Sequence, residues 1–121
     1  MTEQTSAPTF ALDVNRLTLQ YEPVPLAAIA EGSPETGSYE LAPYAGVSIG
    51  VWELTAGGMR DIEIDEVFLV TAGSAVMLVH HEEREDESIP LRSGTIVRLT
   101  AGMVTTWFVD EPLRKVYLIP R

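Results

Sequence analysis

Residues 47–80 read VSIGVWELTAGGMRDIEIDEVFLVTAGSAVMLVH, and apolar residues alternate there with small or polar ones over several short runs. Such alternation is typical of half-buried β-strands, in which successive side chains point to opposite faces. It predicts three strands, at residues 47–52, 62–70 and 74–80. The glycine-containing segments 56–58 and 71–73 are predicted turns between these strands.

The downstream residues continue the same pattern. Residues 81–88 are mostly charged and are predicted to form a hairpin tip in solvent. Four more short strands are predicted at 89–91, 95–99, 105–109 and 114–119, with turns at 93–94, 101–102 and 110–112. Short strands at about ten-residue spacing, without an amphipathic helix of useful length, are typical of a β-sandwich or small barrel. The sequence therefore predicts an all-β fold.

The residues before this region divide into a tail and an arm. Residues 1–8 lack periodicity and are predicted to be a disordered tail. Residues 9–44 are predicted to hold a strand at 16–21 and then a proline-rich arm, because closely spaced prolines disfavour a helix. We expect this arm to pack along the body of the protein or against a second subunit, and the barrel to occupy residues 45–121.

Length and composition exclude several classes of protein. The 121 residues fit one domain, and 45% hydrophobic with 21% charged residues exclude a wholly disordered chain. No apolar run approaches the roughly 18 residues that a membrane span requires. Cysteine is absent, which excludes disulfides, thiolate nucleophiles, iron–sulfur clusters and cysteine-based zinc sites. A formal net charge of −10 makes nucleic acid and anionic membranes poor partners, and the lack of a signal-peptide pattern predicts a cytoplasmic location.

Glu66 is the first candidate functional residue. The predicted strand at 62–70 places it on an apolar face, whose other members are Ile62, Ile64, Phe68 and Val70. The opposite face carries Asp61, Glu63 and Asp65. An ionised carboxylate facing a core is unfavourable unless it is paired, bound to a metal or protonated. Glu66 is therefore either a ligand or acid/base group inside a barrel, or a rim residue paired with Arg60, Arg98 or Arg114.

A second group of candidates lies on the last two predicted strands. Thr105 and Trp107 share a strand face, and Tyr117, like Trp107, combines an apolar ring with a polar tip, which suits both a core and a ligand pocket. Lys115 is the only lysine in the chain. It either pairs with Glu66 or a substrate carboxylate in a buried site, or lies exposed on its strand.

His80 and His81 are the only histidines. Neighbouring residues on a strand point to opposite faces, so both cannot bind one metal unless the strand has ended there. We expect a solvated hairpin end at this position. The sequence also has no Ser-His-Asp arrangement and no phosphate-binding glycine loop.

Four segments carry a family resemblance: Gly50-Val51-Trp52-Glu53, Thr55-Ala56-Gly57, Asp65-Glu66-Val67-Phe68 and Arg114-Lys115-Val116-Tyr117-Leu118-Ile119. They resemble the cupin superfamily and, within it, the small single-domain branch named for the (S)-ureidoglycine aminohydrolase cupin domain. The resemblance spans roughly Val47 to Pro120. It implies a small antiparallel jelly-roll barrel, usually homodimeric, with the active site inside the barrel.

The resemblance also implies where a metal would be held. The first cupin motif ends in Glu followed, after six residues, by Gly, and Glu66 and Gly73 match it. Two histidines should precede that Glu, where this chain has Arg60 and Ile62, or Met59 and Asp61. In the second motif Gly94 and Gly102 match, Thr100 replaces Pro, and Thr105 replaces the ligand His. One ligand of four matches, whereas a first-row metal needs three or four, so we expect neither a metal nor another cofactor.

Three functional hypotheses follow. The first is a metal-free cupin that binds a small polar metabolite in a pocket lined by Glu66, Phe68, Thr105, Trp107 and Tyr117, with Trp52 or Arg98 near the mouth. The second is a metal-independent isomerase or epimerase in which Glu66 is the acid or base and Tyr117 or Lys115 stabilises negative charge. The third is a structural dimer whose barrel is filled by Phe68, Leu99, Trp107 and Leu118. A homodimer is expected from the family and from the apolar arm at 26–30, which needs a surface to cover.

Overall fold

The computed structural model describes residues 10–121, so the predicted tail at 1–8 lies outside the described residues. Within the described part there is no α-helix, only two short 3-10 helices, η1 (Val14–Arg16) and η2 (Leu26–Ala28). The strands are β1 (Tyr21–Pro23), β2 (Ile29–Glu31), β3 (Glu35–Glu40), β4 (Val47–Leu54), β5 (Gly57–Ile62), β6 (Glu66–His80), β7 (Glu87–Arg92), β8 (Ile96–Leu99) and β9 (Val104–Pro120). The predicted all-β fold is confirmed.

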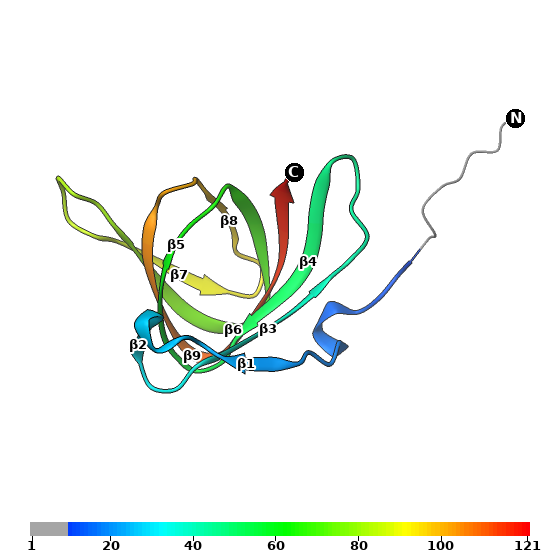
Figure 1. Cartoon of the computed structure of the whole chain (residues 1–121), viewed down its shortest axis with the longest axis horizontal. Helices are drawn as coiled ribbons and strands as arrows, with labels where there is room; N and C mark the ends of the chain where they lie inside the picture. Colours follow the sequence, from blue (N-terminus) through cyan, green and yellow to red (C-terminus); the bar gives the residue numbers. More distant parts are fainter. Residues whose placement is uncertain (1–9) are drawn as a thin grey trace, which may run out of the picture.

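Two long strands, β6 and β9, form the spine of the fold. They pair antiparallel along most of their length, from Val67 opposite Leu118 to His80 opposite Val104. At one end β4 pairs with β9 and β8 pairs with β6, while β3 and β1 extend the sheet beyond β4. At the other end β5 and β2 follow β9, and β7 pairs with β6. The result is one antiparallel sheet curled into a jelly-roll barrel (Figure 1).

The turns predicted at 71–73 and 110–112 are both wrong. β6 and β9 continue through these segments, and Ala72 still pairs with Arg114 and Ser74 with Glu111. The register shifts there, which is how two paired strands bend without reversing direction. Gly73 has a φ of +91°, and a Cβ at this position would collide with the carbonyl of Pro112. Gly73, which contacts Pro112 on the neighbouring strand, thus marks a corner of the barrel and not a hairpin turn.

The proline-rich arm lies on the barrel as part of the same sheet. Its strands β1 and β3 pair with each other, and β3 pairs with β4 from Thr36 opposite Leu54 to Glu40 opposite Gly50. The strand predicted at 16–21 is wrong in position, because Asp13 caps a 3-10 turn by accepting a hydrogen bond from the Asn15 amide at 3.0 Å. Only from Tyr21 does the chain become a strand.

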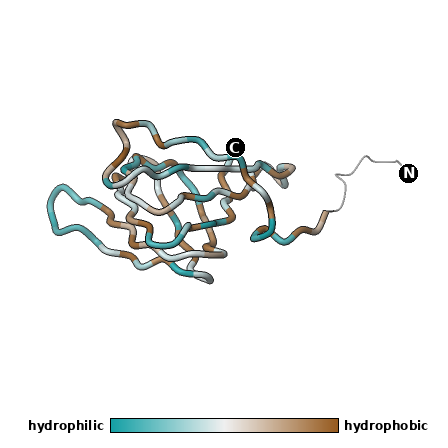
Figure 2. Tube along the Cα trace, turned by 90° about the horizontal axis from the view of Figure 1, so that it is seen from below, coloured by the Kyte–Doolittle hydropathy of each residue, from teal (hydrophilic) through white to brown (hydrophobic). Residues whose placement is uncertain are grey.

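The hydrophobic core fills one part of the barrel interior. Its largest fully buried members include Trp107, Phe68, Leu54, Met77, Leu91 and Leu99. The loop that joins β6 and β7 projects away from this core and is strongly hydrophilic (Figure 2). None of the helices in the described residues has the length and apolar character to cross a membrane. The remaining interior, between β3, β4, β5 and β9, contains the cavity described next.

Candidate functional site

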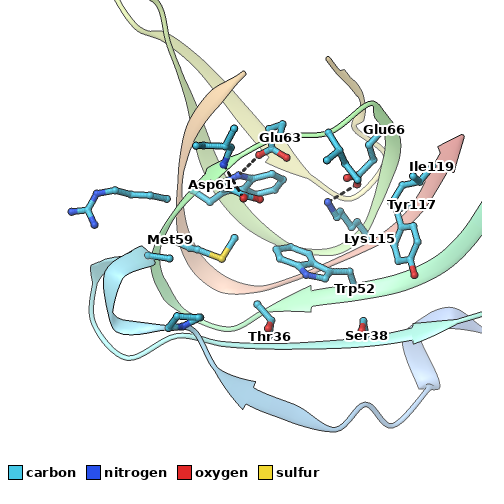
Figure 3. A pocket seen from close by; sticks show the side chains of 16 residues that line it. Thr36, Ser38, Trp52, Met59, Asp61, Glu63, Glu66, Lys115, Tyr117 and Ile119 are labelled. Atoms are coloured by element: carbon cyan, nitrogen blue, oxygen red, sulfur yellow. Dashed lines mark hydrogen bonds and ion pairs between the residues drawn. The ribbon is translucent and has the colours of Figure 1, made fainter. Parts of the chain in front are cut away.

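A cavity of about 590 Å³ opens from the barrel interior to solvent. Its walls come from η2, β3, β4, β5, the β5–β6 connection, β6 and β9. The side chains that line it combine aromatic rings, three carboxylates, one ammonium, one guanidinium and three hydroxyls (Figure 3). This volume is in the range of small-molecule sites, and a mainly apolar wall with a few polar groups is their usual composition.

Lys115 and Glu66 form an ion pair on one side of the cavity. The Lys115 Nζ donates to Glu66 Oε2 at 2.7 Å, and both residues are more than 90% buried. The same Nζ lies 4.5, 4.3 and 5.0 Å from the ring centroids of Trp52, Phe68 and Trp107. A cation this close to aromatic faces is attracted by their negative electrostatic potential. The three rings and the carboxylate together fix the ammonium in the cavity.

Glu63 lies across the cavity from this pair and is 6% exposed. Its Oε2 accepts hydrogen bonds from Thr105 Oγ1 at 2.6 Å and from Trp107 Nε1 at 3.2 Å. Burial is the main cause that raises the pKa of Glu63, and the neighbouring Asp61 charge adds to it, against the bonds from Thr105 and Trp107. A carboxylate in this position accepts a proton more readily than one in water.

Asp61 stands beside Glu63 on the same wall. Its Oδ1 accepts from the Ile62 amide at 2.8 Å. Asp61 is exposed at the rim of the cavity, and partial desolvation there raises the pKa of its carboxyl against this bond and the Lys115 charge. Asp61 and Glu63 therefore form a second acidic group in the cavity, which we call the acidic wall. Neither is in an ion pair within the described residues.

Tyr117 closes the cavity beyond the ion pair. It pairs with Gly50 in the β4–β9 ladder, and a Cβ on that glycine would overlap the Tyr117 hydroxyl and ring. Gly50 therefore lets the ring lie flat across β4. Burial raises the pKa of the Tyr117 phenol, and the carboxylates of Glu40 and Glu66 raise it further. The hydroxyl consequently stays protonated and can donate a hydrogen bond to a ligand.

The structure brings most of the sequence-predicted site residues to this cavity. Trp52, Glu66, Trp107, Lys115 and Tyr117 line it. Phe68 is fully buried beneath the Lys115 ammonium, and Thr105 is fully buried behind Glu63. Arg98 is elsewhere: it is exposed on β8 and lines a separate depression of about 290 Å³. Of the four proposed partners for Glu66, the structure selects Lys115.

The acidic wall lies on the inner face of the barrel, whereas the sequence predicts it on the outer one. The prediction put Glu63 and Asp61 opposite Glu66, with Ile62 and Ile64 inside, yet these isoleucines are 69% and 52% exposed. The cause is a break at 63–65, where Glu63 bonds to the backbone of Gly102 and Met103 and the chain then enters β6. Glu63 and Glu66 are three positions apart, so strict alternation would put them on opposite faces, but the break lets both line the cavity. The only available signal was the second way of aligning the cupin motif, which puts Asp61 at a ligand position.

The ion pair has a counterpart on the outer face of the same strand. Arg114 Nε donates to Glu53 Oε1 at 2.7 Å, and Arg114 Nη1 donates to the carbonyls of Val14 and Leu17 at 2.7 and 2.8 Å. Burial by itself lowers the pKa of Arg114, but bonds to Glu53 and Tyr21 outweigh it and raise the value overall. Arg114 thus stays cationic and ties the N-terminal segment to the barrel.

The histidines lie away from the cavity. His80 bridges Asp86, at 3.0 Å from Nδ1, and Thr106 Oγ1, at 2.7 Å from Nε2, while His81 is near Glu87 and Arg84. Both contribute to the base of the β6–β7 hairpin. Within residues 10–121 no group of three or more His, Cys, Asp or Glu side chains is arranged to hold a metal ion.

Comparison with known proteins gives a family and a fold. Residues 41–117 match the model of the EutQ-like cupin domain. No curated protein matches the sequence. Among solved structures, EutQ from Clostridium difficile has a TM-score of 0.59 at 15% identity, with 72% of this chain and 68% of that chain covered.

Two further solved structures widen the comparison. A protein of unknown function from Pseudomonas syringae pv. tomato has a TM-score of 0.71 at 21% identity, with 89% of this chain and 46% of that chain covered. Ectoine synthase from P. lautus has a TM-score of 0.59 at 18% identity, with 70% and 63% covered. The chain thus spans about two thirds of EutQ and less than half of the Pseudomonas protein. At these identities the similarity concerns the fold alone.

Proposed function

Because this chain belongs to the EutQ-like cupin domain family, we propose that it uses its barrel cavity to bind a small polar metabolite without a resident metal. The observation that carries this proposal is the Lys115–Glu66 ion pair, which is held at 2.7 Å in an open cavity of about 590 Å³. A charged pair is costly to desolvate, and both residues line the cavity, where a ligand can reach them.

The donor set argues against a metal in this cavity. Imidazole and thiolate are the ligands that first-row metals prefer, and the chain has no cysteine and keeps both histidines at the β6–β7 hairpin. Glu66, which matches the cupin ligand, is already bonded to the Lys115 ammonium. The ammonium therefore supplies a fixed positive charge inside the barrel at the carboxylate that a metal would otherwise use.

The cavity also favours binding over a filled barrel. Phe68, Leu99 and Trp107 are fully buried, but Leu118 is 37% exposed and does not close the interior. The space that remains is about twice the roughly 300 Å³ at the lower end of small-molecule sites.

A thermal-shift screen tests this proposal. Untagged protein, purified without chelator, is melted with a library of small polar metabolites and separately with Mn, Fe, Ni, Zn and Co. We expect at least one metabolite to raise Tm in a concentration-dependent way and the metals to leave it unchanged. The shift should disappear in Trp52→Ala and persist in Tyr39→Ala, since Tyr39 is exposed on β3 outside the cavity. Stoichiometric bound metal, or a large Tm rise with one of the five, would overturn the metal-free proposal.

A second candidate function is metal-independent acid/base catalysis. The specific observation in its favour is that Glu66 and Lys115 place a proton acceptor and a proton donor side by side, with the Tyr117 hydroxyl on the same wall. Replacing Glu66 with Gln separates the two functions. Catalysis should collapse in Glu66→Gln, whereas binding of a neutral ligand should only weaken.

We also propose a homodimer, on the family's usual behaviour. The apolar arm supplies less support than its sequence suggested, because Ala28 and Ile29 pack against the chain's own core and Leu26 remains 88% exposed. Exposed apolar side chains on adjoining strands, Leu69, Ile96 and Leu118, offer a larger surface. Light scattering at micromolar concentration tests this proposal, and a 13.3 kDa species throughout would refute it.

A further inference from the structure

The charges in the cavity do not balance. Three carboxylates line it, those of Asp61, Glu63 and Glu66, against the single ammonium of Lys115. Lys115 and Glu66 pair with each other at 2.7 Å. The other cation at the cavity, Arg60, is exposed, and its Nη1 donates to the Ile29 carbonyl at 2.7 Å. The acidic wall is therefore left without a cationic partner among the described residues.

The acidic wall also has unused hydrogen-bond acceptors. Both bonds to the 94%-buried Glu63 go to Oε2, and the one bond to Asp61 goes to Oδ1. Within residues 10–121 every fully buried side-chain nitrogen or oxygen has a partner, so Glu63 Oε1, which has none, must reach the cavity space. Glu63 Oε1 thus faces the cavity with no donor among the described residues, and two positions away the exposed Asp61 lines the same cavity with no side-chain donor on its Oδ2.

Aromatic surface lies next to these acceptors. Trp52 is half-buried, and Figure 3 shows its ring below the acidic wall and next to Lys115. The Trp107 indole contacts both the acidic wall and the ion pair, because its Nε1 donates to Glu63 while its ring centroid lies 5.0 Å from the Lys115 Nζ. A ligand that spans this space would place one end at the carboxylates and an apolar or planar part against Trp52.

Building on the proposed function, we infer that the metabolite carries a nitrogen cation with N–H donors, a primary ammonium or an amidinium, which binds the acidic wall formed by Asp61 and Glu63. Charge-assisted hydrogen bonds from such a group would satisfy the free oxygens of both residues. An anionic ligand would be repelled, because the ion pair has already neutralised Lys115. A metal ion is a poorer fit, because these carboxylates are not arranged as a metal-holding group.

The proton equilibria of the site agree with this inference. The groups that act on Glu63 are Asp61 on β5 and Thr105, Trp107 and Lys115 on β9, and Glu66 on β6 lines the same cavity. Burial raises the pKa of Glu63, and partial desolvation raises that of the more exposed Asp61, which means that the protein alone stabilises the ionised form of Glu63 in particular poorly. A bound cation would supply the missing stabilisation.

Three probes of matched size test the inference: benzylammonium, benzyl alcohol and benzoate. The chain has two tryptophans, both of which line the cavity, so the two indole N–H signals in a ¹⁵N NMR spectrum report binding directly. We expect benzylammonium to shift the Trp107 indole signal with a Kd about tenfold lower than that of benzyl alcohol, and benzoate to bind most weakly. Mg²⁺ is titrated in parallel.

Charge-removing variants locate the effect. Asp61→Asn and Glu63→Gln should each weaken benzylammonium about fivefold or more while leaving benzyl alcohol nearly unchanged. Glu63→Gln retains an amide oxygen for the bonds from Thr105 and Trp107, which protects the fold. Glu22→Gln on β1, outside the cavity, changes the net charge equally and should not alter either affinity.

The possible outcomes distinguish a failure of this inference from a failure of the proposed function on which it rests. Benzyl alcohol or benzoate binding as tightly as benzylammonium would overturn the cation preference and leave cavity binding intact. A Mg²⁺ shift that disappears in Asp61→Asn would overturn the organic cation in favour of a metal ion. Indole signals that no probe moves at millimolar concentration would count against both the inference and the proposed function.

Discussion

Arg114 and Lys115 are consecutive residues of β9, both more than 90% buried and both paired with a glutamate at 2.7 Å, yet they stand on opposite faces of the sheet. The β4–β9 register places Glu53 opposite Arg114 and Trp52 opposite Lys115. On the outer face, the guanidinium uses its fork of donors on one carboxylate, two backbone carbonyls and a tyrosine. On the inner face, the ammonium has one carboxylate and three aromatic rings.

The difference between the two positions is how completely the protein satisfies each charge. Arg114 has no open side, because the N-terminal segment around Val14 and Leu17 covers it. Lys115 and Glu66 border an open cavity, and the acidic wall across from them lacks a partner in the described residues. Similar chemistry therefore serves stability on one face and is available for ligand binding on the other.

The largest expected effect comes from Arg114→Met. This change leaves the partly buried Glu53 carboxylate and two backbone carbonyls without their donor, so we expect the free energy of unfolding to fall by about 4 kcal/mol. Urea denaturation measures the loss, and hydrogen exchange should show residues 14–21 opening first. Arg92→Met is the matched control, because Arg92 is exposed and forms no ion pair within the described residues.

Arg114→Lys tests whether the outer pair serves stability alone. It keeps the charge but loses the planar fork, so about half of the destabilisation should remain while benzylammonium affinity stays at the wild-type value. A change in that affinity comparable to the change in stability would mean that the outer pair also shapes the cavity, and the proposed division between faces would be wrong.

The inner pair should give a smaller loss of stability together with a change in binding. Lys115→Met leaves Glu66 buried without its ammonium, and we expect about 3 kcal/mol of destabilisation. The double variant Lys115→Met/Glu66→Gln should lose less than the sum of the two single variants, because neither residue is left as an unpaired charge. Urea unfolding of all four proteins gives the coupling energy. Additive losses would show that the 2.7 Å contact contributes nothing to the fold.

How much the sequence predicts follows from the regularity of the strands. β4 and the end of β9 pair without a shift from Val47 opposite Pro120 to Leu54 opposite Leu113, so simple alternation puts Trp52, Lys115 and Tyr117 on the inner face. The acidic wall lies where β5 gives way to β6, and there a backbone contact to residues 102–103 interrupts the alternation. Such a contact between segments 40 residues apart in the chain leaves no local pattern in the sequence. The two corners at Gly73 and Pro112 were missed for the same reason.

The smallest expected effect is a pH dependence that distinguishes the acidic wall from Arg114. Because the pKa of Glu63 is raised in the folded state, its protonated form favours folding at low pH. That contribution is complete below the unfolded-state pKa and is lost as pH rises through the folded-state pKa. Glu63→Gln cannot titrate, so the variant should become more stable relative to the wild type as pH increases across this window.

Unfolding of the wild type and Glu63→Gln over the acidic to neutral range measures this difference, with Glu22→Gln as the control whose curve should follow the wild type. Benzylammonium affinity should rise in the wild type over the same window, since deprotonation of Glu63 creates the charge that the cation needs. Stability and affinity would then change in opposite directions with pH at one residue.

The Arg114–Glu53 pair should show no such opposite change of stability and affinity, because hydrogen bonds to Glu53 and Tyr21 raise the pKa of the Arg114 guanidinium and keep it charged throughout. A Glu63→Gln variant that loses stability relative to the wild type as pH rises would mean that the carboxylate is satisfied by the fold, as Glu53 is, and that the acidic wall is a structural feature.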